Sequence, residues 1–448
     1  MKIDIPQDVS FILDELTRRG FEAYAVGGCV RDAYMGREPQ DWDITTSALP
    51  EEVKGIFRRT VDTGIAHGTV MVMRGNTGYE VTTYRVDGAY GDSRHPDSVT
   101  FTSSLTEDLR RRDFTMNAMA YHPQQGIVDP FGGIADIDRG IIRCVDDPLA
   151  RFTEDALRIL RALRFAAQLS FTLEPATEDA VRQLAGRLTL ISAERINAEL
   201  TKLLVSPHPE VFRMMWSLGV TRVILPEFDQ MMEMPQENPF HHLSVGEHTL
   251  VCLQNVPADP VLRWSALLHD AGKVRIHTRD EEGLDHFKGH AAVSAEMAED
   301  VMRRLRFDND SRERACLLIR WHDYAFQMNK KSVRRIMSRV GKENFPDLMK
   351  LVRGDTLAKS AYAQELLMPE IEQVEEMARE IEADEDALSL KDLAVTGRDL
   401  IAQGMAPGKE LGRTLSRLLE LVLEDPSLNR KEYLLAQVRE WAAQEEAK

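Results

Sequence analysis

Long apolar runs, a cysteine framework and an excess of positive charge are all missing from this sequence of 448 residues. No stretch of about 18 apolar residues occurs, which excludes a transmembrane helix. The first residues contain no basic region followed by an apolar run, so we expect no signal peptide. The four cysteines lie far apart without a CxxC pair, which disfavours a disulfide framework or a zinc knuckle. The sequence therefore predicts a cytoplasmic protein with reduced thiols and no membrane partner.

Acidic residues outnumber basic ones, 73 against 56, and the formal net charge is −17. Such a balance would argue against a nucleic-acid partner, because phosphate binding requires lysine and arginine. However, the segment 370–386 alone holds nine acidic residues and one arginine. We interpret this segment as a solvated helix face. Basic patches that bind phosphates elsewhere on the chain are therefore not excluded.

The pattern of the sequence changes near residue 145. Before it, short apolar runs alternate with glycine-containing turns; after it, helical periodicity dominates. This pattern predicts an α+β protein, in which a mixed α/β head with a small sheet is followed by all-α regions. We expect four parts: 1–145, 146–234, 235–368 and 369–448. The head should contain a hairpin turning at 76–78, and residues 147–169 should form one amphipathic helix.

Two carboxylates stand two residues apart in the predicted strand 41–46. Asp41 and Asp43 should point to the same face of that strand, where they repel each other unless a cation lies between them. Mg²⁺ suits such a pair because it prefers hard oxygen ligands and is often shared with substrate phosphates. Glu80, on a later predicted strand, could supply a third oxygen. Taken alone, such a pair is more often a surface or turn feature.

Glycines 27 and 28 separate a predicted strand from a predicted helix, so backbone N–H groups there could face a triphosphate, with Arg31 one turn further on. The ordered combination GGCVRD and DWDITT resembles the catalytic head of the nucleotidyltransferase superfamily. RRDFTMNAMAY (111–121) and EDALR (154–158) extend the likeness over residues 20–205. The chain is identified as a member of the class II bacterial tRNA nucleotidyltransferases, the branch that also includes bacterial poly(A) polymerases.

The EDALR segment leads to the most specific prediction, which concerns recognition of the nucleotide base. At helical spacing, Asp155 and Arg158 would share a face, and Arg161 and Arg164 would continue a basic stripe. Taken alone, residues with this spacing more often form salt bridges within a helix on a solvated surface. A carboxylate accepts from an exocyclic amine and a guanidinium donates to ring nitrogens, so the pair could recognise cytosine or adenine. The resemblance implies this role for Asp155 and Arg158, with CTP and ATP as substrates.

The resemblance also implies a mechanism. The 3′-hydroxyl of tRNA attacks the α-phosphate of CTP or ATP, and pyrophosphate leaves. Metal ions, Mg²⁺ by expectation, would be held by Asp41 and Asp43, with Glu80 as a third carboxylate. The implied nucleotide-binding residues are Gly28, Arg31, Arg112, Asp155, Arg158, Arg161 and Arg164, with Asn117 near the sugar.

Three activities share such a head: complete CCA addition, partial addition (of CC alone or of A alone), and poly(A) synthesis. Residues 84–101 resemble the flexible loop of enzymes that add the whole CCA sequence. Related poly(A) polymerases carry a strongly basic tail, whereas the last residues here are acidic. We therefore rank CCA addition first, A-only addition second and poly(A) synthesis third.

Eight of the twelve histidines fall between residues 241 and 322. Their ordered set resembles the HD-domain phosphohydrolases, and imidazole and carboxylate ligands suit a divalent metal. By that pattern the metal ligands are His248, His269, Asp270 and Asp355, with His290 and His322 as candidates for a second metal or for phosphate. The identity of the metal stays open. The chain could have phosphohydrolase activity as a second or as its main function, or the domain could serve as a helical body for tRNA.

These resemblances imply a role for each of the four predicted parts, in chain order: catalytic head, nucleotide-selecting neck, HD domain and tail. The neck, body and tail are expected to bind the tRNA acceptor arm through its shape and phosphates. In the tail, a basic stripe of three side chains four residues apart could contact phosphates: Lys409, Arg413 and Arg417. A non-catalytic RNA-binding scaffold would leave the head motifs unexplained. The sequence does not predict the oligomeric state.

Overall fold

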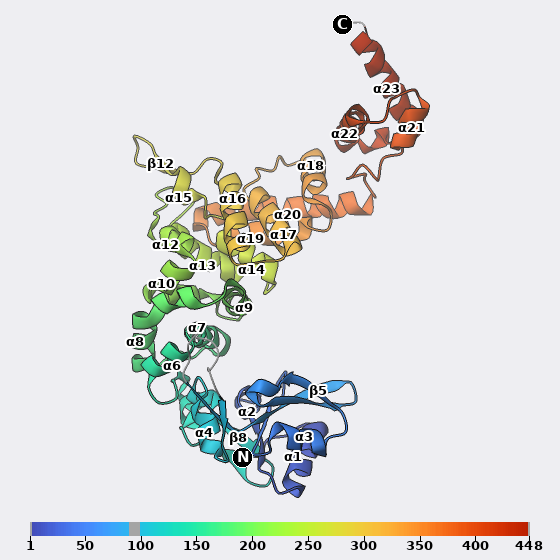
Figure 1. Cartoon of the computed structure of the whole chain (residues 1–448). Coiled ribbons are helices and arrows are strands. Elements are labelled where there is room, and N and C mark those ends of the chain that lie inside the picture. Colours follow the sequence, from blue (N-terminus) through green and yellow to red (C-terminus); the bar gives the residue numbers. More distant parts are fainter. Residues whose placement is uncertain (1, 89–98, 447–448) are drawn as a thin grey trace. The chain divides into compact units, whose positions relative to one another are not determined.

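A computed structural model describes residues 2–88 and 99–446 of the chain (Figure 1). The central part of the predicted loop, 89–98, lies outside the described residues. Contacts divide the chain into two compact units, 1–226 and 227–448. The finer division into four parts stays a prediction. None of the helices in the described part is long and apolar enough to cross a membrane.

A seven-stranded sheet forms the centre of the first unit, and its order is β3-β4-β5-β2-β1-β8-β9. Neighbouring strands are antiparallel except for β2 and β5, which are parallel. Along the sheet, the strands span Thr60–Gly64 (β3), Thr69–Arg74 (β4), Thr77–Thr83 (β5), Ile44–Thr46 (β2), Ala23–Val26 (β1), Ala120–His122 (β8) and Gly126–Val128 (β9). The predicted hairpin is β4–β5, but its turn lies at Gly75 and Asn76 rather than at 76–78, because Arg74 already pairs with Thr77.

Helices α1 (Gln7–Arg18) and α3 (Pro50–Ile56) cover one face of this sheet. Apolar residues at helical spacing on α1 pack on every second residue of the central strands, among them Ile44 and Val81. Because side chains alternate along a strand, the residues next to Ile44 and Val81 face away from this core. The opposite face carries a second apolar cluster at β1 and β8, which includes Tyr24, Val26 and Ala120, and has polar side chains at β2 and β5.

The other helices of the first unit are α2 (Gly28–Tyr34), α4 (Leu105–Arg110), α5 (Gly133–Arg139), α6 (Pro148–Glu154), α7 (Leu157–Leu169), α8 (Pro175–Leu184), α9 (Ala193–Leu204), α10 (Phe212–Ser217) and α11 (Val220–Ile224). The expected single helix over 147–169 is wrong. The chain leaves the helical conformation at Asp155 (φ −138°, ψ 105°), which separates α6 from α7. Short two-stranded pairs complete the unit: β6 (Arg85–Asp87) with β7 (Val99–Phe101), and β10 (Ile141–Ile142) with β11 (Thr172–Leu173).

The second unit is helical, as expected, with one small hairpin. Its helices are α13 (Val245–Asn255), α14 (Pro260–Leu268), α15 (Lys273–Ile276), α16 (His290–Arg304), α17 (Asn309–Trp321), α18 (Lys330–Val340), α19 (Phe345–Leu357), α20 (Ala361–Ala383), α21 (Gly397–Ala402), α22 (Lys409–Glu424) and α23 (Lys431–Glu446); α12 (Pro226–Glu233) precedes them. The hairpin is β12 (Thr278–Arg279) with β13 (Asp285–His286). Pro369, near a predicted boundary, lies inside α20.

Candidate active sites

The two predicted catalytic aspartates lie in the segment that leads into β2. Asp41 and Asp43 directly precede the strand, which begins at Ile44 rather than at residue 41. The parallel register pairs Ile44 with Val81 on β5, so Asp43 and Glu80 precede paired positions on adjacent strands. Since Ile44 and Val81 face the core under α1 and α3, Asp43 and Glu80 face the opposite side of the sheet.

The surroundings raise the pKa of two of these carboxyl groups, Asp43 and Glu80. Burial raises the pKa of Asp43, Arg112 opposes this, and Asp41 adds to it. Burial and the charges of Asp43 and Asp41 likewise raise the pKa of Glu80. In the described residues, the three carboxylates do not form a group of ligand atoms within 4.8 Å. Mg²⁺ usually binds one or two carboxylates and takes its other ligands from water and substrate phosphates, so it does not require a compact group of three.

A cavity of about 720 Å³ opens beside the carboxylates, and Gly28, Arg31, Asp41, Asp43 and Arg164 are among the residues that line it. It is therefore large enough for a nucleotide.

The strand-to-helix turn at the rim of this cavity can be built only with glycine. Gly27 has φ +83°, and a Cβ there would lie 2.7 Å from Nη1 of Arg112. The turn thus packs directly on the Arg112 guanidinium, next to the N-terminus of α2. This places Arg112 close to the residues expected to hold the triphosphate.

A chain of hydrogen bonds between buried side chains connects α2 with α7. Arg31 donates to Oδ1 of Asn117 (2.6 Å), and the Asn117 amide donates to Oδ1 of Asp113 (3.0 Å). Arg161 donates to the other oxygen, Oδ2, of Asp113 (2.7 Å). Burial opposes ionisation of Asp113, but Arg161, Asn117 and Arg158 together outweigh it and lower the pKa to about 2. Asp113 therefore fixes the orientation of Asn117 and Arg161, two residues predicted to touch the nucleotide.

The predicted Asp155–Arg158 pair is arranged differently from the expectation. Because α6 ends at Glu154, Asp155 does not share a continuous helix face with Arg158. Arg195 of α9 donates to Oδ2 of Asp155 (2.9 Å), whereas Arg158 donates to Glu154 (2.7 Å). Arg158 also donates to the Arg111 carbonyl, so both proposed base-recognising groups are held by neighbours.

The partners on α9 were missed by sequence reasoning. One of these partners is Arg195. The other is Glu199, which accepts a hydrogen bond from buried Arg164 (2.6 Å). These ion pairs join segments 35 to 40 residues apart, so neither helical spacing nor a local motif could have indicated them.

The histidine set of the second unit converges closely. His248 on α13, His269 and Asp270 after α14, and Asp355 on α19 are all buried, and each offers a ligand atom within 4.8 Å of the others. Nε2 of His248 lies 2.8 Å from Oδ1 of Asp355 and 3.6 Å from Oδ2 of Asp270. Nε2 of His269 is buried and has no hydrogen-bond partner among the described residues.

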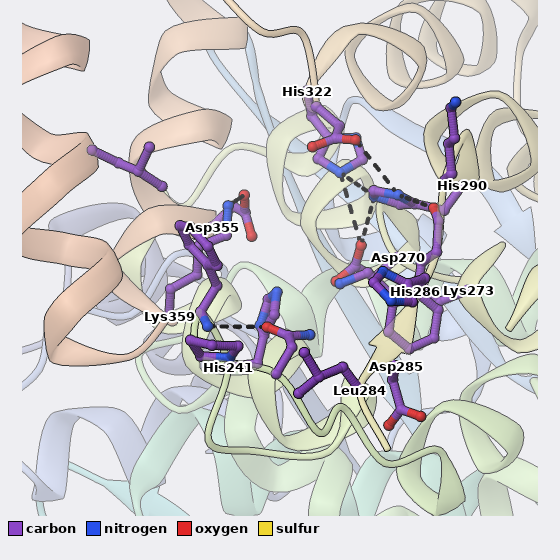
Figure 2. A pocket seen from close by; sticks show the side chains of 17 residues that line it. His241, Asp270, Lys273, Leu284, Asp285, His286, His290, His322, Asp355 and Lys359 are labelled. Carbon is purple, nitrogen blue, oxygen red and sulfur yellow. Dashed lines mark hydrogen bonds and ion pairs between the residues drawn. The ribbon is translucent and has the colours of Figure 1, made fainter. Parts of the chain in front are cut away.

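The second predicted group shares one carboxylate with the first. Asp270, His290 and His322 also bring ligand atoms within 4.8 Å, and Figure 2 shows both imidazoles directed at Asp270. Nε2 of His290 lies 3.1 Å from Oδ1 of Asp270 and 3.2 Å from Nε2 of His322. Asp270 is therefore common to two groups of side chains, each of which could hold a divalent metal.

The backbone selects the tautomer of all four imidazoles. Their Nδ1 atoms face the carbonyls of Ala358, Ala266, Phe287 and Ile319, at 3.2, 2.7, 3.1 and 2.6 Å respectively. A proton on Nδ1 leaves the lone pair of Nε2 directed into the site, as in metal-binding histidines generally. The pKa shifts of the rings differ: burial lowers the pKa of His322 to about 3, whereas Asp270 and Asp355 overcome the effect of burial on His269 and raise its pKa to about 10. The four imidazoles thus share one orientation, with Nδ1 at a backbone carbonyl and Nε2 toward the site.

Three more residues belong to this site although the sequence interpretation did not select them. Lys273 lies 2.7 Å from Oδ2 of Asp270, and Lys359 donates to Oδ2 of Asp355 (2.8 Å). Their spacings, i+3 and i+4 from the aspartates, could have indicated these contacts. His241 packs edge-on against His248, with ring centroids 5.0 Å apart. All three line a cavity of about 570 Å³ (Figure 2).

Models of three known families match successive parts of the chain. Residues 23–143 match the poly A polymerase head domain. Residues 170–232 match the model described as "Probable RNA and SrmB- binding site of polymerase A", and residues 280–438 match tRNA nucleotidyltransferase domain 2.

Relatives of similar length match almost the whole chain. A CCA-adding enzyme of Lactobacillus helveticus is 37% identical over 94% of this chain and 95% of its own length. A CCA-adding enzyme of Leuconostoc mesenteroides is 35% identical, with 96% of each chain covered. The crystal structure of the Bacillus stearothermophilus CCA-adding enzyme in complex with CTP superposes with a TM-score of 0.74 at 30% identity and covers 98% of both chains.

Proposed function

Because the chain belongs to the family of CCA-adding enzymes, we propose that the cavity beside Asp41 and Asp43 is where it adds CCA to the 3′ end of tRNA from CTP and ATP. The observation that carries this assignment is the pair of carboxylates at the wall of a nucleotide-sized cavity that also holds Arg31 and Arg164. A cytoplasmic location suits an enzyme that acts on tRNA.

The reaction is a nucleotidyl transfer. The 3′-hydroxyl oxygen of tRNA bonds to the α-phosphorus of the nucleotide, the hydroxyl proton is lost, and the bond to pyrophosphate breaks. Asp41 and Asp43, with Glu80, would hold Mg²⁺, which supplies Lewis acidity at the attacking and leaving oxygens. Backbone N–H groups near Gly28 and the guanidinium of Arg31 bind the triphosphate.

Selection of the base is assigned to the junction between α6 and α7. Asp155 accepts from the exocyclic amine of cytosine or adenine, and Arg158 donates to the ring acceptors. Arg195 and Glu154 hold these two groups in place. Arg164 lines the cavity, and Arg112 and Arg161, the latter held by Asp113, are assigned to the cationic surroundings of the nucleotide.

Replacing Arg158 by alanine tests the base-recognition role. We expect the preference for CTP over UTP to fall by about tenfold or more, since a paired hydrogen-bonding group contributes about 1–3 kcal/mol of discrimination. The affinity for tRNA should stay unchanged. The measurement compares kcat/KM for the four nucleotides. Arg182→Ala, which removes an exposed arginine on α8, is the matched control. Unaltered selectivity in Arg158→Ala would refute the role.

The basic stripe on α22 is proposed to contact tRNA phosphates. Lys409, Arg413 and Arg417 are exposed, and the Arg417 guanidinium also stacks on Trp441, 3.8 Å from the ring centroid. Replacing all three by alanine should make the salt dependence of tRNA binding shallower, by about 0.7–0.9 in the log–log slope for each phosphate that the variant no longer neutralises. A triple variant of exposed arginines elsewhere, Arg182, Arg303 and Arg379, is the control. Equal slopes in both triple variants would contradict the assignment.

A second activity is proposed for the histidine site. His248, His269, Asp270 and Asp355 would hold a divalent metal, with His290 and His322 at a second position, and the metal supplies Lewis-acid activation of water. In the hydrolysis of a phosphoester, water oxygen bonds to phosphorus, the bond to the ester oxygen breaks, and that oxygen takes up a proton. The four Nδ1–carbonyl contacts are the observation that favours this second function. Lys273 and Lys359 provide the positive charge that a phosphoryl group requires.

A further inference from the structure

Three of the arginines assigned to the nucleotide gather around one aromatic ring, that of Phe165 on α7. The guanidinium carbons of Arg164, Arg31 and Arg161 lie over this ring, at 4.2, 4.9 and 5.5 Å from its centroid. Arg31 comes from α2 and the other two from α7. Cations from two helices therefore meet at Phe165, which itself lines the nucleotide-sized cavity.

Each of the three guanidinium groups is also anchored by a different carboxylate. The pairs are Arg31 with Asp32 (2.8 Å), Arg161 with Asp113 (2.6 Å) and Arg164 with Glu199 (2.6 Å). In the described part of the chain, each carboxylate forms an ion pair with one of the three arginines only. The carboxylates therefore do not set the positions of the arginines relative to one another, whereas the ring of Phe165 contacts all three.

An aromatic ring holds a guanidinium group differently from a carboxylate. A carboxylate takes up N–H donors and neutralises the charge, whereas the face of a ring attracts the cation and leaves its charge in place. Arg164 donates from Nε to Glu199 and from Nη1 to Gln168, which leaves Nη2 without a hydrogen bond among the described residues. A guanidinium group over Phe165 thus keeps charge and a donor for a triphosphate.

We propose that Phe165 is a positioning residue, whose ring holds the guanidinium groups of Arg31 and Arg164 in place for the triphosphate of CTP or ATP. The proposal rests on the assignment of the cavity beside Asp41 and Asp43 to nucleotidyl transfer. Both arginines line that cavity together with Phe165. Because the guanidinium groups are ordered before the nucleotide arrives, less conformational entropy is lost on binding. The base takes no part, so CTP and ATP depend on Phe165 equally.

A purely structural role for Phe165 makes a different prediction. The side chain is 5% exposed and packs edge-on against Phe114, with ring centroids 5.9 Å apart. If packing were its only role, truncation would lower stability and activity together. The two roles differ in one property, the negative charge of the ring face. Fluorine withdraws electrons from that face and barely changes the size of the ring, so fluorination separates them.

A fluorination series at position 165 of the full-length chain is the test. Phenylalanine is replaced there by its 4-fluoro, 3,5-difluoro and 3,4,5-trifluoro forms, and incorporation of CTP and of ATP into tRNA is measured at steady state. We expect KM for both nucleotides to rise in steps, by about fivefold or more at the trifluoro form, with kcat within about twofold. Inorganic tripolyphosphate, which has neither base nor sugar, should weaken as a competitive inhibitor by the same factor.

Trifluorophenylalanine at position 152 is the matched control. Phe152 on α6 is fully buried in the same unit, and within the described residues no guanidinium group lies over its ring. The control should therefore leave KM and kcat unchanged. Phe165→Leu, which removes the ring and keeps an apolar side chain, should raise both KM values at least as much as the trifluoro form.

Equal KM values across the series would overturn the positioning role. So would a rise confined to CTP or to ATP, which indicates contact with the base, and so would a fall in kcat at unchanged KM. The same rise in KM at position 152 would show an effect of packing and also overturn it. If the unmodified chain incorporates both nucleotides and the series is flat, only the role of Phe165 fails. If it incorporates neither, the assignment of the cavity fails as well.

Discussion

Asp41→Ala and Asp43→Ala are each expected to lower the incorporation of both CTP and ATP by about a thousandfold or more. The loss should affect both nucleotides equally, because the carboxylates act on the phosphates and not on the base. A Lewis acid that stabilises the attacking and leaving oxygens contributes several kcal/mol to the transition state, which is the basis of this figure. Single-turnover incorporation with radiolabelled nucleotides measures the effect.

The same substitutions should leave the fold intact. Burial and the neighbouring Asp41 raise the pKa of Asp43, so ionised Asp43 destabilises the folded state in the absence of a cation. A raised carboxyl pKa means that stability is lost as the pH rises through it. Asp43→Asn in EDTA at neutral pH is therefore expected to unfold at the same Tm as the unmodified chain, or at a higher one.

Asp62→Ala is the matched control for these variants. Asp62 lies on β3 of the same sheet, is exposed and pairs with Lys54, so its removal should change neither incorporation nor Tm appreciably. Normal turnover in Asp41→Ala or Asp43→Ala, or a loss confined to one of the two nucleotides, would contradict the metal-binding role.

His269→Ala is expected to remove the divalent metal from the second unit and to abolish phosphoester hydrolysis, while CCA addition stays within about twofold. Nε2 of His269 is buried, has no hydrogen-bond partner in the described part of the chain, and lies 3.3 Å from Asp270 and 3.6 Å from Asp355. Without His269, the proposed set of metal ligands is incomplete. Bound metal is measured on the purified chain by elemental analysis, and hydrolysis with 2′,3′-cyclic nucleotides.

His286→Ala is the control for this variant, since His286 lines the same cavity but is exposed and pairs with Asp280. It should retain the metal. Asp355→Asn keeps the side-chain volume and separates loss of a ligand from loss of packing. Retention of the metal in both His269→Ala and Asp355→Asn would show that these residues do not bind it.

Sequence patterns were most informative where chemistry is concentrated in short segments. The DxD pair and Glu80 were predicted to share a metal; Asp43 and Glu80 directly precede paired positions of β2 and β5, and their role as metal ligands stays a prediction. The histidine set was recognisable because its residue types recur in a fixed order, and four of its members do converge.

The remaining features depend on tertiary contacts that no local pattern encodes. The helical spacing of Asp155 and Arg158 predicted a shared face, but the helix is interrupted at Asp155. The Asp155 carboxylate instead accepts a hydrogen bond from Arg195, forty residues later in the sequence. Asp113 joins residues of two helices through opposite oxygens of one carboxylate. Such contacts follow from how the helices pack, which periodicity alone does not determine.

Incubation of the chain with CTP, ATP and tRNA that lacks its three terminal nucleotides is the most direct test of its main activity. The products are resolved at single-nucleotide length. Two cytidines followed by one adenosine, with one pyrophosphate released per nucleotide and no growth beyond that length, is the predicted result. Addition of adenosine alone, a lengthening adenosine tail, or an unchanged tRNA would contradict the account.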